Sequence, residues 1–165
     1  MRRRSYIILT LAVFALTLTS CQNYKKLRFI DTQVTNVKFI GTSQVELDLN
    51  VQIDNPTVSS YTITNLFGTF YKNDKDFADV QILDNVTIVP RCMNNLPVPL
   101  QLTMINPLGF LNGISLDTFK TDAYTVSLDI TVRNGIGLSK HIIYDHMPAK
   151  DLLDEFRVSG IAVNK

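Results

Sequence analysis

Apolar and polar residues alternate without interruption along three segments of this chain, residues 45–53, 98–104 and 124–132. Successive side chains of a β-strand point to opposite faces, so a period of two predicts strands with one buried and one solvated face. The first segment ends at Asp54, Asn55 and Pro56, because proline cannot donate to a sheet ladder and asparagine favours turns. The third segment ends at Asn134 and Gly135, which mark a turn.

Shorter candidate strands fill the gaps between these segments, at residues 33–40, 61–65, 68–71, 79–83, 86–89, 140–144 and 158–163. Strands of this size and spacing predict an all-β, antiparallel β-sandwich rather than alternating β-α units. Helix is scarce. Residues 108–120 could hold a short helix weakened by two glycines, and residues 148–156 favour a second one that begins at a proline.

The first twenty residues follow a different pattern. Arg2, Arg3 and Arg4 precede a nearly uncharged apolar run from residue 6 to residue 18. As a helix, such a run spans about 20 Å, which is short of the roughly 30 Å hydrocarbon core of a bilayer. A basic start followed by a short apolar run is typical of a secretory signal peptide rather than a transmembrane anchor.

The apolar run ends in Leu18, Thr19, Ser20 and Cys21, and this sequence resembles the lipobox of bacterial lipoproteins. The resemblance implies cleavage between Ser20 and Cys21 after the Cys21 sulfur has received a diacylglycerol. Two or three acyl chains hold a protein stably on a membrane, whereas one does so only marginally. The alternative is an ordinary signal peptide with a cysteine near its end by chance.

On this interpretation the chain divides into a signal peptide at 1–20, a lipidated cysteine and tether at 21–30, and one folded domain at 31–165. No aspartate stands directly after Cys21, so the familiar inner-membrane retention signal of enteric lipoproteins is missing, and so is an acidic surface-export signal. We therefore expect a lipid-anchored protein of the cell envelope, with the periplasmic face of the outer membrane as the favoured location.

Cleavage would also change the charge of the chain. The complete sequence carries 16 Lys and Arg against 15 Asp and Glu, a formal net charge of +1. Loss of the three N-terminal arginines leaves a mature chain of about −2, so composition gives no reason to expect a nucleic-acid partner. Cys92 would then be the only free thiol, and we expect it to be a small buried hydrophobe rather than a catalytic group.

Residues 45–73 resemble the start of the LEA type 2 domain, also called the WHy or LEA14-like domain. The residues that carry the resemblance are an alternating strand ending in Asp54, Asn55 and Pro56, then Tyr61-Thr62-Ile63, and a second strand ending in Phe70-Tyr71-Lys72-Asn73. Thr57 stands where the family most often has a second asparagine. From there to Lys165 the likeness lies in the strand pattern alone.

This resemblance implies a small β-sandwich similar to fibronectin type III domains, with no common catalytic centre and a link to desiccation and stress. Many stress-protective LEA proteins are very hydrophilic and disordered. This chain has a mean hydropathy of +0.10 and strands of period two, so it should fold. Protection by a flexible, hydrated coil is therefore not its expected mechanism.

No residue pattern in the sequence indicates an enzyme, a cofactor or a metal centre. A straight strand would place His141 and His146 on opposite faces and would put His141 and Asp145 on the same face, but no third ligand follows nearby. The acidic residues between 73 and 79 lack the central glycine and closing glutamate of a calcium loop, and a solvated hairpin turn is the expected structure there. No serine lies in a Gly-x-Ser-x-Gly elbow.

The class of function that remains for this domain is binding. We expect a non-catalytic binding or structural module, anchored in the membrane through Cys21 and serving an envelope protein partner, with desiccation or stress protection as a second hypothesis. The alternative is a periplasmic carrier of a small apolar ligand or lipid. Loops at the ends of a sandwich and unpaired sheet edges can accept partners, and the first loops to consider are those around Asn55 and Pro56, residues 73–79 and residues 134–137.

Overall fold

The computed structural model describes residues 24–105 and 123–161, which form an antiparallel, sandwich-like sheet with one short helix and a 3-10 turn at residues 24–26. The predicted all-β class is confirmed. The elements are β1 (Arg28–Ile40), β2 (Gln44–Asn55), β3 (Tyr61–Lys72), β4 (Lys75–Ile82), β5 (Val86–Ile88), β6 (Cys92–Met104), β7 (Tyr124–Asn134), β8 (Ser139–Pro148), α3 (Ala149–Glu155) and β9 (Val158–Ile161).

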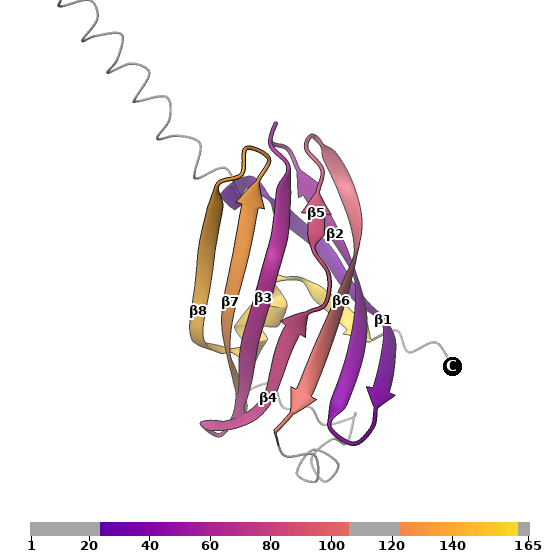
Figure 1. Ribbon diagram of the computed structural model, residues 1–165, viewed down its shortest axis with the longest axis vertical. Helices are drawn as coiled ribbons and strands as arrows, with labels where there is room; N and C mark the ends of the chain where they lie inside the picture. Colours follow the sequence, from indigo (N-terminus) through magenta and orange to yellow (C-terminus); the bar gives the residue numbers. More distant parts are fainter. Residues whose placement is uncertain (1–23, 106–122, 162–165) are drawn as a thin grey trace, which may run out of the picture.

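Hydrogen bonding joins nine strands of the described chain in the order β8-β7-β3-β4-β6-β2-β1-β9, and β5 pairs with β3 beside β4. In Figure 1, β8, β7 and β3 lie side by side, whereas β2 and β1 cross behind and beside β6, so the sheet folds over on itself. Every pair is antiparallel except β1 with β9.

The three strands with clean alternation are present as β2, β6 and β7, and each is longer than its alternating segment. In β7 the even-numbered residues from Tyr124 to Ile130 are buried, as a period of two requires. Residues 61–65 and 68–71, predicted as two strands, are one continuous strand, β3. The register of β3 against β7 shifts between Ile63 and Asn65, and regular pairing continues through Leu66 and Phe67, where the sequence predicted a gap between two strands.

The core consists of two apolar clusters. The first joins Val51 and Ile53 of β2 with Tyr61, Val86, Ile88 and Val98. The second joins buried residues of β7 with Val80 of β4 and Ala149 of α3. Leu152 and Phe156 pack against the second cluster, so the predicted helix at 148–156 is confirmed and closes that part of the sandwich. The predicted helix at 108–120 lies outside the described residues.

The folded domain begins earlier than the sequence indicated. Tyr24, Leu27 and Phe29 pack against the first apolar cluster, and the Phe29 ring contacts the Phe156 ring edge-on at 4.8 Å between centroids. Most of the range 21–30, which the sequence assigned to a tether, therefore belongs to the fold. The reason is that these apolar side chains cover the open end of the core.

Candidate functional site

One end of the sandwich is built from the segment where the chain enters the fold and from three loops. We call it the proximal end and define it as residues 24–28, 56–60, 89–93 and 134–138, the upper end in Figure 1. Backbone hydrogen bonds join the loops: Arg91 donates to the Thr57 carbonyl at 3.1 Å, and Gly135 donates to the Ser60 carbonyl at 3.0 Å.

Two buried asparagines hold this end together. The Asn55 side chain donates to the carbonyls of Ser59 and Val89 at 2.9 and 3.1 Å, and its oxygen accepts from the backbone and hydroxyl of Thr57. The Asn94 side chain accepts from the Val89 backbone at 2.8 Å and donates back to its carbonyl at 3.1 Å. The ends of β2 and β6 are thereby fixed to the turn after β5, and the loops are pre-formed.

The 3-10 turn at residues 24–26 adds a basic border to the proximal end. The Lys140 ammonium lies over the Tyr24 ring, 4.7 Å from its centroid, which connects this turn to β8. An open hollow next to it is lined by Lys25, Lys26, Arg28, Pro56, Thr57 and Val58. Asp54 lies opposite Arg28 in the register of β1 and β2.

Two of the three predicted loops meet at the proximal end, and the third does not. The loop after Asn55 and Pro56 contacts the turn at residues 134–137 through Ser60. The β3–β4 turn lies at the opposite, distal end of the sandwich (Figure 1). Its residues Asn73 and Asp74 have φ values of 50° and 60°, so it is a tight hairpin turn, as expected. No pattern in the sequence groups the first two loops.

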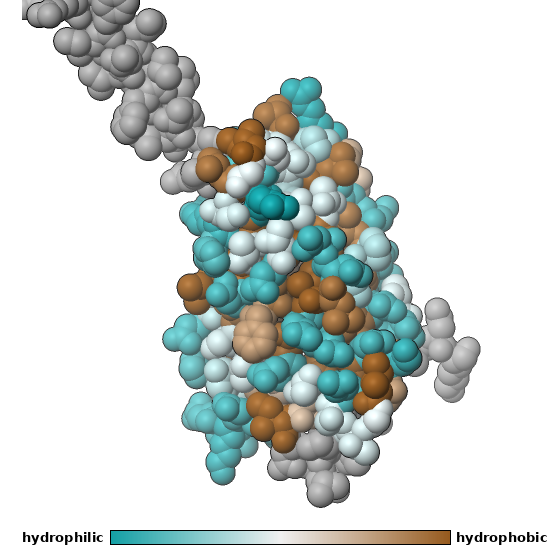
Figure 2. Space-filling model, in the orientation of Figure 1, coloured by the Kyte–Doolittle hydropathy of each residue, from teal (hydrophilic) through white to brown (hydrophobic). Residues whose placement is uncertain are grey.

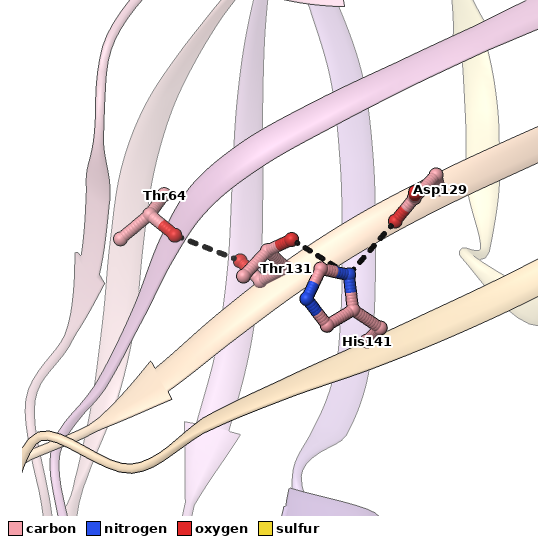
Figure 3. Close-up of polar contacts among 4 residues, drawn as sticks. All are labelled: Thr64, Asp129, Thr131 and His141. Carbon is pink, nitrogen blue, oxygen red and sulfur yellow. Dashed lines mark hydrogen bonds and ion pairs between the residues drawn. The ribbon is translucent and has the colours of Figure 1, made fainter.

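His141 lies on the outer side of β8 and contacts β7, not Asp145 (Figure 3). Its Nδ1 atom lies 3.5 Å from the Asp129 carboxylate and 3.3 Å from the Thr131 hydroxyl. Both partners therefore approach the same ring nitrogen. In a catalytic triad the acid and the nucleophile contact different nitrogens, so this arrangement is an exposed polar contact between strands.

His141 and Asp145 lie on one face of β8, as expected, but they do not contact each other, because residues four apart in a strand are about 13 Å apart. Their partners are alternate residues of β7, Asp129 and Thr131 for His141 and Ser127 for Asp145.

β8 also contains a bulge: Val126 pairs with Met147 but Leu128 pairs with Tyr144, so two β8 residues, Asp145 and His146, lie in a step where β7 has one. His146 adopts a φ of 46°, and its ring stacks on Tyr71 on this same outer face, at 4.6 Å between centroids. The predicted placement of the two histidines on opposite faces is therefore wrong, and both are exposed, with side-chain exposures of 64% and 55%.

The bulge brings together Ser127, Asp145 and His146, a group that the sequence pattern did not reveal. His146 Nδ1 lies 2.7 Å from the Asp145 carboxylate, and the Ser127 hydroxyl donates to the same carboxylate at 3.1 Å. These two contacts, first that of His146, lower the pKa of Asp145. The carboxylate lies between the serine and the histidine, so the imidazole does not face the hydroxyl as a general base must.

Cys92 is exposed, which contradicts the expectation of a buried thiol. It is the first residue of β6 and follows Arg91, whose φ is 56°. At this rim position the strand extends beyond the apolar core, and the Cys92 thiol donates to the Val89 carbonyl at 3.7 Å. Cys21 and Ser20 lie outside the described residues.

The described ranges contain no group of three or more side chains that could hold a metal ion. Over the same ranges, no helix has the length and apolar character needed to cross a bilayer.

Comparison with known proteins adds little to this geometry. No family model and no curated protein matches the chain. Among solved structures, the chain is similar to a protein from Archaeoglobus fulgidus, at 16% identity and a TM-score of 0.46. The likeness covers 71% of this chain and 93% of the archaeal one. A likeness this distant carries no functional argument.

Proposed function

We propose that this protein is a lipid-anchored, non-catalytic module of the bacterial cell envelope that binds or supports an envelope protein partner. The observation that carries the proposal is the position of Tyr24, which already packs on the core three residues after Cys21. Three residues of extended chain reach about 10 Å. A lipid on Cys21 would therefore hold the folded domain directly on the membrane surface, at the periplasmic face of the outer membrane.

The arrangement of polar groups supports a role without catalysis. Both histidines are exposed. His141 Nδ1 contacts the Asp129 carboxylate and the Thr131 hydroxyl at the same nitrogen, and His146 Nδ1 contacts the Asp145 carboxylate of its own strand, which also accepts from Ser127. Neither ring therefore lies between an acid and a nucleophile as the base of a catalytic triad does. A domain of this kind offers surfaces rather than a reaction centre.

The anchor is tested by labelling cells with a palmitate analogue. Wild-type protein should carry the label and sediment with membranes, whereas Cys21→Ser should lose the label and remain as uncleaved precursor. The matched control is Cys92→Ser, which changes the other cysteine of the chain and should keep the label. Equal labelling of wild type and Cys21→Ser would contradict the proposal.

The partner is tested by crosslinking in intact cells. The anchored wild type should capture at least one envelope protein that Cys21→Ser does not, because the anchor confines the domain to the membrane surface. If both proteins capture the same set in the same amounts, the anchor does not direct the interaction, and that part of the proposal fails.

The resemblance to LEA type 2 domains supports stress protection as a second role within the same proposal. The residues that carry the resemblance form a structural corner, since Asn55 is fully buried and closes the loop after β2. The test is the activity that a drying-sensitive enzyme retains after desiccation with the full chain. Retention above that with an equal mass of albumin supports protection, and equal retention removes it.

The alternative role as a carrier of an apolar ligand requires an enclosed apolar space. Two hollows on the described surface are open rather than enclosed. One lies beside the 3-10 turn at residues 24–26, and the other is lined by Thr35, Asp48, Leu49, Asn50, Asp84, Asn85, Pro97 and Pro99. Charged and polar side chains line both of them beside apolar ones, and neither encloses a ligand, so they give this alternative no support.

A further inference from the structure

Exposed apolar side chains gather at the proximal end of the sandwich, on loop tips where polar residues are usual. They are Val58, Val89, Met93, Ile136 and Leu138. Val58 is 67% exposed and Ile136 is 73% exposed. Figure 2 shows brown, apolar side chains at this upper end of the molecule. Because Arg91 bonds to Thr57 and Gly135 to Ser60, the three loops present these side chains together.

Basic side chains surround this apolar group. Lys25, Lys26, Arg28, Arg91, Arg133 and Lys140 are all exposed. Asp54, half-buried opposite Arg28, is the acidic residue placed beside them by the strand register. The proximal end is therefore cationic although the mature chain as a whole is slightly acidic. Apolar tips within a basic border are the pattern of surfaces that bind the headgroup region of anionic bilayers.

The path of the chain indicates which surface this end meets. Tyr24 lies at the proximal end, under the Lys140 ammonium, and Cys21 precedes it by three residues. An acyl anchor on Cys21 would keep the proximal end within about 10 Å of the membrane. The β3–β4 turn, with Asp74 at its tip, would point away from the bilayer.

We propose that the proximal end docks on the surface of an anionic lipid bilayer, with Val58, Ile136 and Leu138 among the headgroups and the surrounding lysines and arginines against lipid phosphates. This inference rests on the proposed lipid anchor and adds an orientation to it. The partner of this surface is the membrane itself, so an envelope protein partner would bind the sides or the distal end.

The natural thiol of Cys92 gives a direct test, because it is exposed at the proximal end. The mature full chain, purified from membranes, is labelled on Cys92 with an environment-sensitive fluorophore and reconstituted into phosphatidylcholine vesicles, with or without about one third phosphatidylglycerol. Lipids with a quencher at the headgroup should quench this label at least twofold more strongly in anionic vesicles. High salt should reduce the difference.

A second reporter controls for proximity due to the anchor alone. Asp74→Cys in a Cys92→Ser background places the same label at the distal end. It should show little quenching in either vesicle. Equal quenching of the two reporters would mean that the domain tumbles freely on its tether, and this result would overturn the docking proposal.

Matched variants then test the apolar tips. Ile136→Asp should reduce the quenching of the Cys92 label in anionic vesicles to nearly the level of the distal reporter. Ile143→Asp is the control, because Ile143 is the same residue type at 71% exposure but lies on the outer side of β8, away from this end. Lys25→Glu with Lys26→Glu, both exposed, provides a second variant that leaves the turn after β7 intact. Unchanged quenching in folded Ile136→Asp and in the lysine variant would contradict docking.

Mass spectrometry of the peptide that contains Cys21 separates this inference from the anchor. Acylated protein without preferential quenching at Cys92 means that the anchor stands and docking fails. If Cys21 is not acylated, the anchor fails, and docking is decided by flotation of the unlabelled chain with anionic vesicles. There Ile136→Asp should float less than Ile143→Asp, and equal flotation would exclude docking.

Discussion

At the scale of single residues, Asn55 shows how one side chain ends a strand and shapes a loop. It is fully buried, and its amide group donates twice and accepts twice. An aspartate of the same size would lack the two donors that reach the carbonyls of Ser59 and Val89. Asparagine is therefore the residue that both stops β2 and positions the loops of the proximal end.

We expect Asn55→Ala to lower the free energy of unfolding by about 3 kcal/mol, because it leaves the buried Thr57 N–H without its acceptor and removes one of the donors to the Val89 carbonyl. Urea unfolding followed by circular dichroism measures the change. Asn50→Ala is the control on the same strand, since Asn50 is exposed, and it should alter stability by less than about 0.5 kcal/mol. Similar losses for both variants would show that the hydrogen bonds of Asn55 do not matter.

The sequence predicted the place of Asn55 but not its partners. A strand followed by Asn-Pro is a local signal, whereas Val89 lies 34 positions away in the chain. The error at Cys92 has the same cause, since no local pattern tells where a strand leaves the core. The turn at Asn134 and Gly135 was predicted. Ile136 and Leu138 are apolar residues next to this turn, where polar residues are usual, and this is the signal in the sequence from which a binding surface could be inferred.

At the scale of elements, the bulge in β8 decides which side chains face the core. Because it adds one residue between the β8 partners of Leu128 and Val126, Tyr144 and Met147 both lie opposite buried residues of β7. Tyr144 donates to the Glu155 carboxylate of α3 at 3.0 Å. The bulge also interrupts the free edge of β8, which lies at one end of the strand order. Such an interruption hinders pairing with the edge of another molecule.

The contact of Tyr144 with α3 predicts a dependence of stability on alkaline pH. Burial, helped by the Glu155 carboxylate, raises the pKa of Tyr144 from 10.0 to about 12. The folded state therefore favours the neutral phenol. This contribution is complete below pH 10, the pKa in the unfolded chain, and is lost as the pH rises from 10 through 12.

We accordingly expect the melting temperature to fall less between pH 10 and 12 in Tyr144→Phe than in wild type, because the variant has no phenol to ionise at this position. Thermal melts at matched ionic strength measure the difference. Glu155→Gln should lie between the two, since burial, the larger cause, remains. Parallel pH profiles for wild type and Tyr144→Phe would show that this group does not contribute.

The sequence indicated most strands because burial on one face imposes alternation, but it could not reveal bulges. Gly68 illustrates the limit. It was predicted to begin a separate strand at residues 68–71, yet it lies within β3 opposite Leu128. A Cβ atom there would lie 2.5 Å from the Ser127 carbonyl oxygen and would collide with the Leu128 side chain. The glycine permits close strand packing rather than a turn.

At the scale of the whole molecule, the order of strands and the meeting of distant loops were beyond sequence reasoning, because both depend on long-range pairing. The proposed membrane-docking surface exists only at this scale. No single loop of the proximal end indicates a membrane surface by itself, and the loops are brought together by the fold of the sheet. With a lipid on Cys21, the short connection to Tyr24 would then turn the proximal end toward the membrane.

That short connection leads to a prediction about tether length. Insertion of ten Gly and Ser residues after Gln22 should weaken the quenching of the Cys92 label in anionic vesicles, because effective concentration falls roughly as the −3/2 power of tether length. Going from three to thirteen residues lowers it about ninefold. Quenching that is independent of the insertion would mean that the anchor does not hold the domain in its docked orientation.

The pairing of β1 with β9 also bears on how the protein is made. Thr32 donates its hydroxyl hydrogen bond to the Phe156 carbonyl, 124 positions away, and its backbone to Arg157. β1 therefore gains β9 as its second neighbour only after residues 156–161 have been synthesised, and until then β2 is its only partner among the described strands. Pairings of such long range form slowly. We accordingly expect the β1–β9 pairing to be among the last contacts that close the sheet during folding.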